Sequence, residues 1–365
     1  MPGRDHDDRL AGPGHHARRR AGGGGHRAAD PAGARAGELM RVVTIPSKGR
    51  LELAERPKPK PVDDQVLVRV AAAGLNRGDL WQLAGGYPPP ADAPQDIPGM
   101  EFAGTVEAIG PAAKRLKVGD RVYGLVGGGA QAEFVAAVEG HCAIVPDGLD
   151  LVMAGAVPEA FITAHDALFT SGGLRDGQSI LIHAVGSGVG TSALQIGKAK
   201  RCKVAGTARS PEKLARAQEL GLDTAIEIPR EVDAAQLIEL MRPVAGSINA
   251  VLDLVGGDYL AADVEAAARR GVIVMLSTIG GDLAKVNLRT FMNKRLTLRG
   301  TTLRHRPKAE KEEAVSDFAR DLGPLFASGA LRPVVETVVS LDNMLDAYEL
   351  LRSDKTFGKV VLKIV

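Results

Sequence analysis

The chain has 365 residues, of which 45% are hydrophobic and 25% are charged, and its formal net charge is +2. This composition is typical of a globular protein with about two domains of roughly 100–200 residues each, and it gives no electrostatic case for nucleic acid or an anionic membrane as a partner. The two cysteines, Cys142 and Cys202, cannot form a disulfide framework, and no apolar run approaches the ~18–20 residues of a membrane span. These features predict a cytoplasmic protein without a membrane segment.

Residues 1–39 differ from the rest of the chain, because they carry runs of His, Arg and Gly with almost no apolar side chain to bury. Such a segment cannot offset the entropy lost on ordering, so we expect a disordered tail. Three interpretations are open: a translated upstream sequence with Met40 as the natural start, a tail added for expression, or a basic and His-rich binding arm. The first is favoured, because the folded pattern begins at Met40.

Residues 40–162 have the pattern of a domain built from short strands. Runs of β-branched residues at 66–70, 104–109 and 121–123 are separated by turns that contain Gly or Pro. Strands of this length and spacing predict a partly closed β-barrel.

Strands and helices alternate from residue 163 to residue 300. The expected strands cover 179–184, 202–207, 224–226, 251–253 and 272–276, and the expected helices cover 189–200, 211–220 and 235–241. For the second of these helices, Ser210 is a favourable N-cap, Pro211 suits the first helical position, and Gly221 is a usual C-cap. The alternation predicts an α/β fold, with a doubly wound parallel sheet.

Residues 301–365 are of mixed character. Helices are expected near 308–327 and 341–352, and strands at 334–339 and 359–364. We expect this last segment to return to the first domain.

A glycine-rich turn, residues 185–190, lies between the first strand and the first helix of the alternating region. It departs from a strict G-x-G-x-x-G pattern, because Thr191 occupies the sixth position of the pattern that begins at Gly186. Such a turn presents backbone amides and the positive end of a helix to a pyrophosphate. We therefore predict that Ser187, Gly188 and Val189 bind a dinucleotide; an ordinary strand–helix turn is the alternative.

The end of the second strand predicts which dinucleotide binds. NAD sites usually place an acidic residue about 20 residues beyond the glycine turn, where it binds the ribose hydroxyls. This region reads Thr207-Ala208-Arg209-Ser210, without an acid. Arg209, Ser210 and Lys213 can instead donate to a 2′-phosphate, which favours NADPH. The alternative is that Arg209 and Lys213 are merely solvated residues at the start of a helix.

An ordered set of short motifs resembles the zinc-independent quinone oxidoreductases of the medium-chain dehydrogenase/reductase superfamily, the zeta-crystallin-like group, and is most similar to its tumour-suppressor-inducible branch. The set spans about residues 40–365, and its members are Leu75-Asn76-Arg77-Gly78-Asp79-Leu80, Tyr87-Pro88-Pro89-Pro90, Gly127-Gly128-Gly129-Ala130-Gln131, Pro158-Glu159-Ala160, Ser187-Gly188-Val189-Gly190, Asp253-Leu254-Val255-Gly256-Gly257, Leu298-Arg299-Gly300-Thr301 and Phe357-Gly358-Lys359. The chain departs from the family at Ser277, usually Gly, at Val272, usually Arg, and near Ile228, where a Tyr often covers the adenine.

The resemblance implies a GroES-like catalytic domain at 40–162, a Rossmann NADPH-binding domain at 163–300, and a segment at 301–365 that returns to the catalytic domain. It implies a homodimer formed through edge strands near 272–276 and 297–301. Further cofactor contacts follow from it at Asn76, Thr163, Ser277, Thr278, Phe357 and Lys359.

No metal site is expected. In the zinc-containing relatives a Cys would stand near Asn76 and a His at Met100, and neither an amide nor a thioether is a good zinc ligand. Glu101 remains, but one acid does not make a site. His141, His165, His183 and His305 are scattered without ligand spacing, and His183 lies on a buried strand.

Without a Lewis acid, the accessible reaction is hydride transfer to an electron-poor acceptor, with hydrogen bonds to the oxygen that gains charge. Quinones fit best; α,β-unsaturated carbonyls or enoyl thioesters are the alternative acceptors, and an NADPH-binding structural or RNA-contacting protein is the alternative from another class. The candidate catalytic residues are Asn76, Tyr87 and Gln131. Asn76 could instead be a turn residue before Asp79, and Tyr87 a packing residue among prolines.

Overall fold

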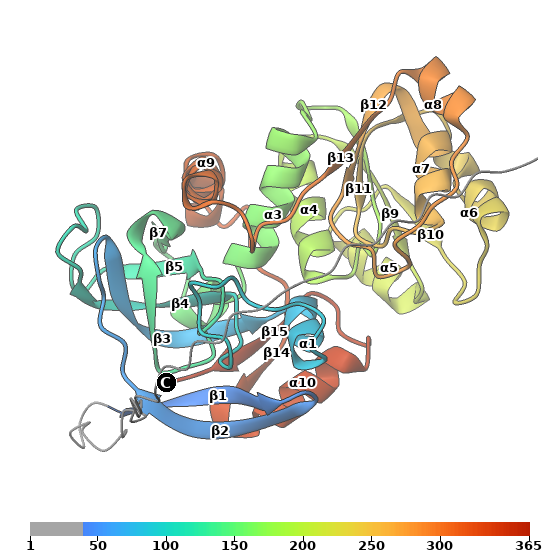
Figure 1. Cartoon of the computed structure of the whole chain (residues 1–365). Coiled ribbons are helices and arrows are strands. Elements are labelled where there is room, and N and C mark those ends of the chain that lie inside the picture. The colour runs from blue at the N-terminus through green and yellow to red at the C-terminus, as the bar shows by residue number, and fades with distance from the viewer. Residues whose placement is uncertain (1–38) are drawn as a thin grey trace, which may run out of the picture.

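The structure is a computed structural model that describes residues 39–365, and it has two bodies, each built around its own sheet (Figure 1). The predicted disordered tail lies outside the described residues, except that Leu39 already belongs to the first strand. No helix in the described part is long and apolar enough to cross a membrane.

The first body contains a strongly bent seven-stranded sheet. Most of its strands pair antiparallel, as expected of a barrel, and β14 and β15 pair with each other in parallel. In spatial order the strands are β14 (Val335–Ser340), β15 (Lys359–Lys363), β3 (Gln65–Leu75), β4 (Glu101–Ile109), β5 (Arg121–Leu125) and β7 (Cys142–Ile144), and β6 (Phe134–Val138) also pairs with β3. The last strand of the chain thus lies inside this sheet, between β14 and β3.

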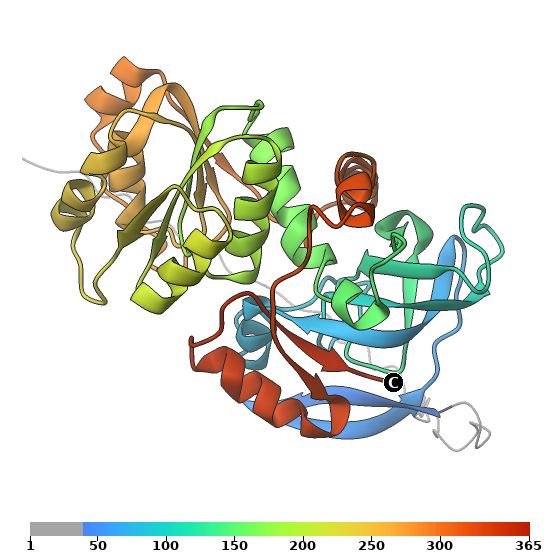
Figure 2. The same cartoon turned by 180° about the vertical axis from the view of Figure 1, so that it is seen from behind.

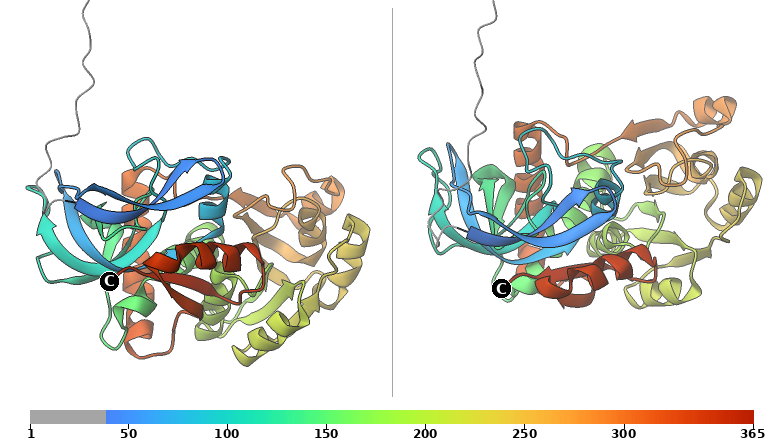
Figure 3. Two further views of the ribbon diagram at one scale, coloured as in Figure 1. Left: turned by 90° about the horizontal axis from the view of Figure 1, so that it is seen from below. Right: turned by 60° about the horizontal axis from the view of Figure 1, so that its bottom comes forward.

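Strands β1 (Leu39–Ser47) and β2 (Arg50–Pro57) form a separate antiparallel hairpin, which the sequence pattern did not predict. The hairpin lies beside helix α10 (Met344–Arg352), as the blue and red segments in Figures 2 and 3 show. Apolar residues from the hairpin, β3 and α10 form one core cluster, which includes Val43, Val66 and Tyr348. Burial of this cluster fixes α10, and with it the loop that follows, against the barrel.

The second body has a six-stranded sheet in which every pair is parallel. Its spatial order is β10 (Thr224–Glu227), β9 (Lys203–Ala208), β8 (Ser179–Ile182), β11 (Ile248–Asp253), β12 (Ala267–Met275) and β13 (Thr297–Gly300). This is the order of a doubly wound nucleotide-binding sheet, with its switch point between β8 and β11. The predicted α/β fold class is confirmed.

Helices cover both faces of this sheet (Figure 1). They are α4 (Gly188–Ala199), α5 (Pro211–Glu219), α6 (Ala234–Leu240), the short η4 (Arg242–Val244), α7 (Tyr259–Ala266) and α8 (Leu288–Lys294). The predicted cap of α5 is confirmed, because the Ser210 hydroxyl accepts a hydrogen bond from the Lys213 amide at 3.3 Å. Gly221 follows the helix with a φ of +95°, in the left-handed conformation that favours glycine.

A continuous helical stretch, residues 158–171, connects the two bodies. It consists of η2 (Pro158–Ile162), α3 (Thr163–His165) and η3 (Asp166–Ser171), and η2 and η3 are π-helical. The expected domain boundary at 162/163 therefore falls inside one helical element. Helix α9 (Lys308–Ala327) contacts η2 as well as β7 of the barrel. The remaining short helices are α1 (Arg77–Leu83), η1 (Glu139–His141), α2 (Leu151–Ala154) and η5 (Leu341–Asn343).

Candidate active site

A cleft of about 550 Å³ lies between the two bodies, at the carboxyl ends of β8 and β9. In open α/β sheets this is the usual place for a bound ligand. Eleven of the predicted site residues line it: Asn76, Tyr87, Thr163, Ser187, Gly188, Val189, Arg209, Ser210, Lys213, Ser277 and Lys359. A neighbouring open groove of about 1280 Å³ shares Tyr87 and Ser277 with the cleft.

The glycine turn forms one wall of the cleft. Ser187 caps α4 and accepts a hydrogen bond from the Gly190 amide at 3.0 Å. The Gly358 amide donates to the Gly186 carbonyl at 2.9 Å, so the segment before β15 is attached to the turn. A Cβ added at Gly188 would lie 2.5 Å from Cδ of Lys359. The turn therefore has the bare backbone and the helix start that a pyrophosphate requires.

Thr163 presents an unsatisfied polar atom in the cleft wall. Its Oγ1 is buried and has no hydrogen-bond partner among residues 39–365. Buried hydroxyls are nearly always paired, so an unpaired hydroxyl in a cleft indicates that a ligand supplies the partner. Together with the glycine turn, this atom shows that the residues present fit a dinucleotide.

A buried network surrounds Lys359 beneath the cleft. The ammonium group donates to the Leu75 carbonyl, to Oδ1 of Asn76 and to Oε1 of Glu101, each at 2.6 Å. The Asn76 amide nitrogen also donates to Oε1 of Glu101, at 2.9 Å. The charged pair of Lys359 and Glu101 therefore fixes the Asn76 side chain, and Asn76 is also the residue that precedes α1.

These contacts also determine whether the site suits a metal ion. Lys359 places a positive charge where a cation would have to bind, and the other Glu101 oxygen, Oε2, accepts from the Glu159 amide at 2.8 Å. In the described part of the chain, no group of three or more His, Cys, Asp or Glu residues is arranged to hold a metal ion. The residues at this position do not fit zinc.

His183 has the structural environment that the sequence predicted, although β8 ends at Ile182 and His183 lies in the turn directly after it. It is fully buried, its Nε2 lies 2.7 Å from Oδ1 of Asp263, and its Nδ1 lies 2.9 Å from Oγ1 of Thr207. Both ring nitrogens are therefore satisfied by protein groups.

Tyr87 forms an aromatic and cationic wall of the cleft. Its ring meets Trp81 and His305 edge-on, with centroid distances of 6.2 and 5.2 Å, and the Arg304 guanidinium carbon lies 4.8 Å from its centroid. The Arg304 guanidinium also donates to the Tyr87 carbonyl at 3.0 Å. Burial raises the pKa of the Tyr87 phenol, which is therefore a neutral hydrogen-bond donor at physiological pH. One face of an aromatic ligand could pack on this wall.

Glu159 is a half-buried acid in the same cleft, and its sequence pattern did not single it out as a site residue. Burial, together with the nearby carboxylate of Glu101, raises its pKa to about 7. A carboxyl group with this pKa can hold and release a proton near neutral pH. Its motif, Pro158-Glu159-Ala160, was visible in the sequence, but the position of the acid beside Glu101 depends on a fold contact across 58 residues.

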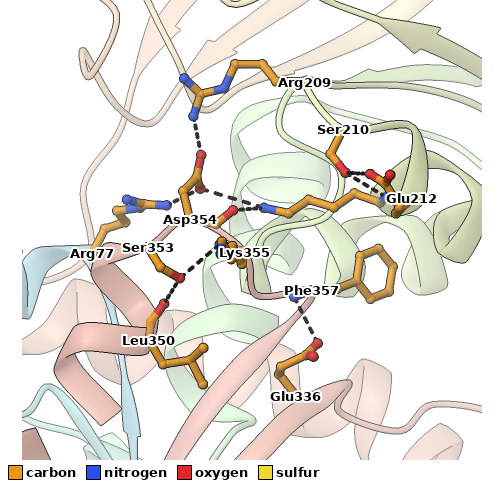
Figure 4. Close-up of polar contacts among 11 residues, drawn as sticks. Arg77, Arg209, Ser210, Glu212, Glu336, Leu350, Ser353, Asp354, Lys355 and Phe357 are labelled. Carbon is orange, nitrogen blue, oxygen red and sulfur yellow. Dashed lines mark hydrogen bonds and ion pairs between the residues drawn. The ribbon is translucent and has the colours of Figure 1, made fainter. Parts of the chain in front are cut away.

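Arg209 and Lys213 lie at the end of β9 and the start of α5, on the adenosine side expected of such a cleft. Figure 4 shows that Arg209 and Arg77 both reach Asp354, in the loop between α10 and β15. Lys213 donates a hydrogen bond to the backbone carbonyl of the same aspartate. Neither Arg77 nor Asp354 was selected from the sequence, because no local motif reports a contact between such distant segments.

Three predicted residues do not line the cleft. Gln131 is fully buried in the barrel, where its Oε1 accepts a hydrogen bond from Tyr348 at 2.9 Å. Thr278 lines the neighbouring groove instead. The Phe357 ring is buried under the Arg216 guanidinium, whose carbon lies 4.4 Å from the ring centroid. Their predicted roles gain no support from these positions.

Comparison with known proteins agrees with the two-body architecture. Residues 62–147 match the family described as alcohol dehydrogenase GroES-like domain, and residues 188–320 match the family described as zinc-binding dehydrogenase. A quinone oxidoreductase from Pseudomonas aeruginosa is 33% identical over 317 residues, which cover 86% of this chain and 95% of that protein.

Two solved structures extend the comparison. A quinone oxidoreductase from Pseudomonas syringae pv. tomato has a TM-score of 0.77 at 30% identity. The match covers 89% of this chain and 100% of that chain. A mycobacterial protein complexed with NADPH has a TM-score of 0.78 at 29% identity, with the same shares covered. These relatives favour an enzyme over a structural or RNA-contacting protein. The chain therefore belongs to the medium-chain dehydrogenase/reductase superfamily, with the quinone oxidoreductases among its relatives, and is an NAD(P)H-dependent oxidoreductase.

Proposed function

We propose that the enzyme is an NADPH-dependent quinone reductase that works without a metal ion. The observation that carries this proposal is the pair of cations at the end of β9: Arg209 and Lys213 line the cleft where NAD enzymes usually place an acid. A 2′-phosphate would find charge-assisted donors there. Ser187, Gly188 and Val189 would hold the pyrophosphate, and Thr163 would contact the nicotinamide half.

The bound cofactor supplies a hydride, and the protein has to orient the acceptor, exclude water and provide a proton. Tyr87 presents a ring on which a flat acceptor can stack and a phenol that can donate to its oxygen. Glu159, with a pKa of about 7, can transfer the proton that completes reduction of a quinone oxygen, and then recover one from solvent.

The same chemistry supports metal independence. The Lys359 ammonium donates to Asn76 and to one Glu101 oxygen, and the Glu159 amide donates to the other, so a cation would have to displace these donors. The acceptor must then be electron-poor without activation by a Lewis acid. Quinones meet this requirement, and the names of the relatives agree with that choice.

We further propose a homodimer that forms through β13. This strand is the edge of the nucleotide-binding sheet, and all four of its residues are exposed. Nearby Leu283, Leu288 and Met292 are exposed by 89%, 66% and 71%. An uncovered edge strand with apolar neighbours favours pairing with a second copy.

Cys142 and Cys202 are both buried and unpaired, which fits the cytoplasmic location that the sequence predicts.

The experiment measures oxidation of NADPH and of NADH by the purified full chain, with and without a chelator. The acceptors are para-benzoquinone, phenanthrenequinone and the enal crotonaldehyde. We expect the highest kcat/KM with NADPH and a quinone, and no effect of the chelator. A higher kcat/KM for the enal would make conjugated carbonyls, rather than quinones, the preferred substrate class. Equal use of NADH would overturn the assignment of NADPH as the cofactor. Loss of activity on chelation would overturn metal independence.

A further inference from the structure

Asp354 joins three cationic side chains that come from separate parts of the fold (Figure 4). Its Oδ1 lies 2.5 Å from the Arg77 guanidinium and 3.7 Å from the Lys213 ammonium, and its Oδ2 accepts from Arg209. Lys213 also donates to the Asp354 carbonyl at 2.6 Å. The contacts connect α1 of the barrel, the end of β9 in the nucleotide-binding body, and the loop after α10.

The environment keeps Asp354 ionised. Burial alone would raise the pKa of its carboxyl group, but Lys213, Arg77 and Arg209 together hold that pKa below its ordinary value. The backbone of Asp354 has a φ of +58°, in the left-handed region that is costly for residues other than glycine, Asn and Asp. The surrounding contacts thus hold a charged side chain in a turn that allows few residue types.

All four charged residues line the same cleft as the glycine turn. Two of them, Arg209 and Lys213, are the residues that the proposed function assigns to the 2′-phosphate. A carboxylate and a phosphate are both anionic oxygen acceptors, and they use the same donors on Arg and Lys. A phosphate bound by Arg209 and Lys213 would also be repelled by a carboxylate held beside it.

We propose that Asp354 is an internal competitor for the 2′-phosphate site. In this arrangement, which rests on the proposed use of NADPH, binding of the phosphorylated ribose displaces the Asp354 carboxylate from Arg209 and Lys213. Asp354 therefore lowers the affinity for NADPH while leaving NADH almost unaffected, and so it determines how strongly the enzyme prefers one cofactor.

Displacement also affects the catalytic end of the cleft. Asp354 is followed by a short segment that leads to Gly358, whose amide binds Gly186 of the glycine turn, and to Lys359, which binds Asn76 and Glu101. Movement of Asp354 thus occurs at the start of the segment that carries these contacts. Asp354 therefore lies on the segment that joins the cofactor-binding turn to the network around Lys359.

The test compares Asp354→Asn with the parent by fluorescence titration of NADPH and NADH and by calorimetry with 2′-AMP and 5′-AMP. Asn keeps the size of the side chain and tolerates a positive φ, so the change removes mainly the charge. We expect the Kd for NADPH and for 2′-AMP to fall about tenfold, and the Kd for NADH and 5′-AMP to change by no more than about twofold. Asp346→Asn is the matched control. Asp346 is exposed on α10, so this substitution removes the same charge at a position away from the three cations.

A second comparison isolates the proposed competition. In an Arg209→Gln background, Asp354→Asn should improve NADPH binding by clearly less than the about tenfold expected in the parent, because one of the two shared donors has been removed and only Lys213 remains. Unchanged or weaker NADPH binding by Asp354→Asn alone would overturn the proposal, since Asp354 would then only position the cations. If the parent binds NADH as tightly as NADPH, the proposed function fails, whereas a selective gain for 2′-AMP would still support competition at this site.

Discussion

The ammonium group of Lys359 lies 2.6 Å from Oε1 of Glu101, with side-chain exposures of 5% and 0%. A buried ion pair of this kind costs desolvation energy when it forms, and removal of one partner leaves the other charge without compensation. We therefore expect Lys359→Met to lower the free energy of unfolding by about 3–5 kcal/mol in urea denaturation.

Lys363→Met is the control for this change, because Lys363 is the exposed last residue of the same strand. It should shift the stability by no more than about 0.5 kcal/mol. The double variant with Glu101→Gln should recover part of the loss, since the buried charge is then gone. If Lys359→Met alone were as stable as the parent, the pair would not be coupled to folding.

Arg209 should discriminate between the two nicotinamide cofactors. A hydrogen bond to a charged group contributes about 1.5–3 kcal/mol, so Arg209→Gln should weaken NADPH binding by roughly 10- to 100-fold. NADH, which has no 2′-phosphate, should bind about as tightly as before. Fluorescence titration measures both constants, and Arg201→Gln, at an exposed arginine near the sheet, is the control. Equal weakening of the two cofactors would contradict the assignment.

Glu159 should give the reaction a pH dependence. Its pKa is raised to about 7, so the proton is present below that pH and is lost as the pH rises through it. The rate with a quinone should therefore fall above pH 7. Glu159→Gln, which cannot donate a proton, should lower kcat by roughly a hundredfold and remove this fall. A variant with the parent's rate and pH profile would show that the proton comes from elsewhere.

The edge strand β13 provides a test of the dimer. Leu298 is exposed by 45% on this strand, and two copies of a charge placed there would repel each other if the two edges paired. Leu298→Glu should therefore shift the mass found by light scattering from two chains toward one. Leu345→Glu, at an exposed residue of α10, should leave the mass unchanged. If both variants have the mass of two chains, the interface lies elsewhere. If the parent has the mass of a single chain, the proposed dimer is excluded.

The α/β fold class could be predicted because its signals are local. Ser210 and Gly221 mark the two ends of α5 through capping, which depends on neighbouring residues alone. The alternation of strands and helices determined the sheet type. The π-helical segments η2 and η3 carry no comparable local signal, and they interrupt the helical pattern where the two bodies meet.

The site was only partly predictable, since its charged contacts join distant segments. Arg209 contacts Asp354 across 145 positions, and Lys359 contacts Asn76 across 283. Residue type alone indicated that Arg209 can bind a phosphate, but not that an aspartate of the same chain would lie against it. Gln131 was predicted by resemblance, and its contact is equally remote in sequence: its Oε1 accepts a hydrogen bond from Tyr348, 217 positions away, inside the barrel.

The hydrogen bond from the Gly358 amide to the Gly186 carbonyl has a consequence for synthesis of the protein. The strands β8 to β13 can pair as soon as they leave the ribosome, but the glycine turn lacks its contact with Gly358 until that segment has also left the ribosome. A nascent chain with a finished nucleotide-binding sheet should therefore still be unable to retain its cofactor, and the cofactor can stabilise only molecules whose final strand has already entered the barrel.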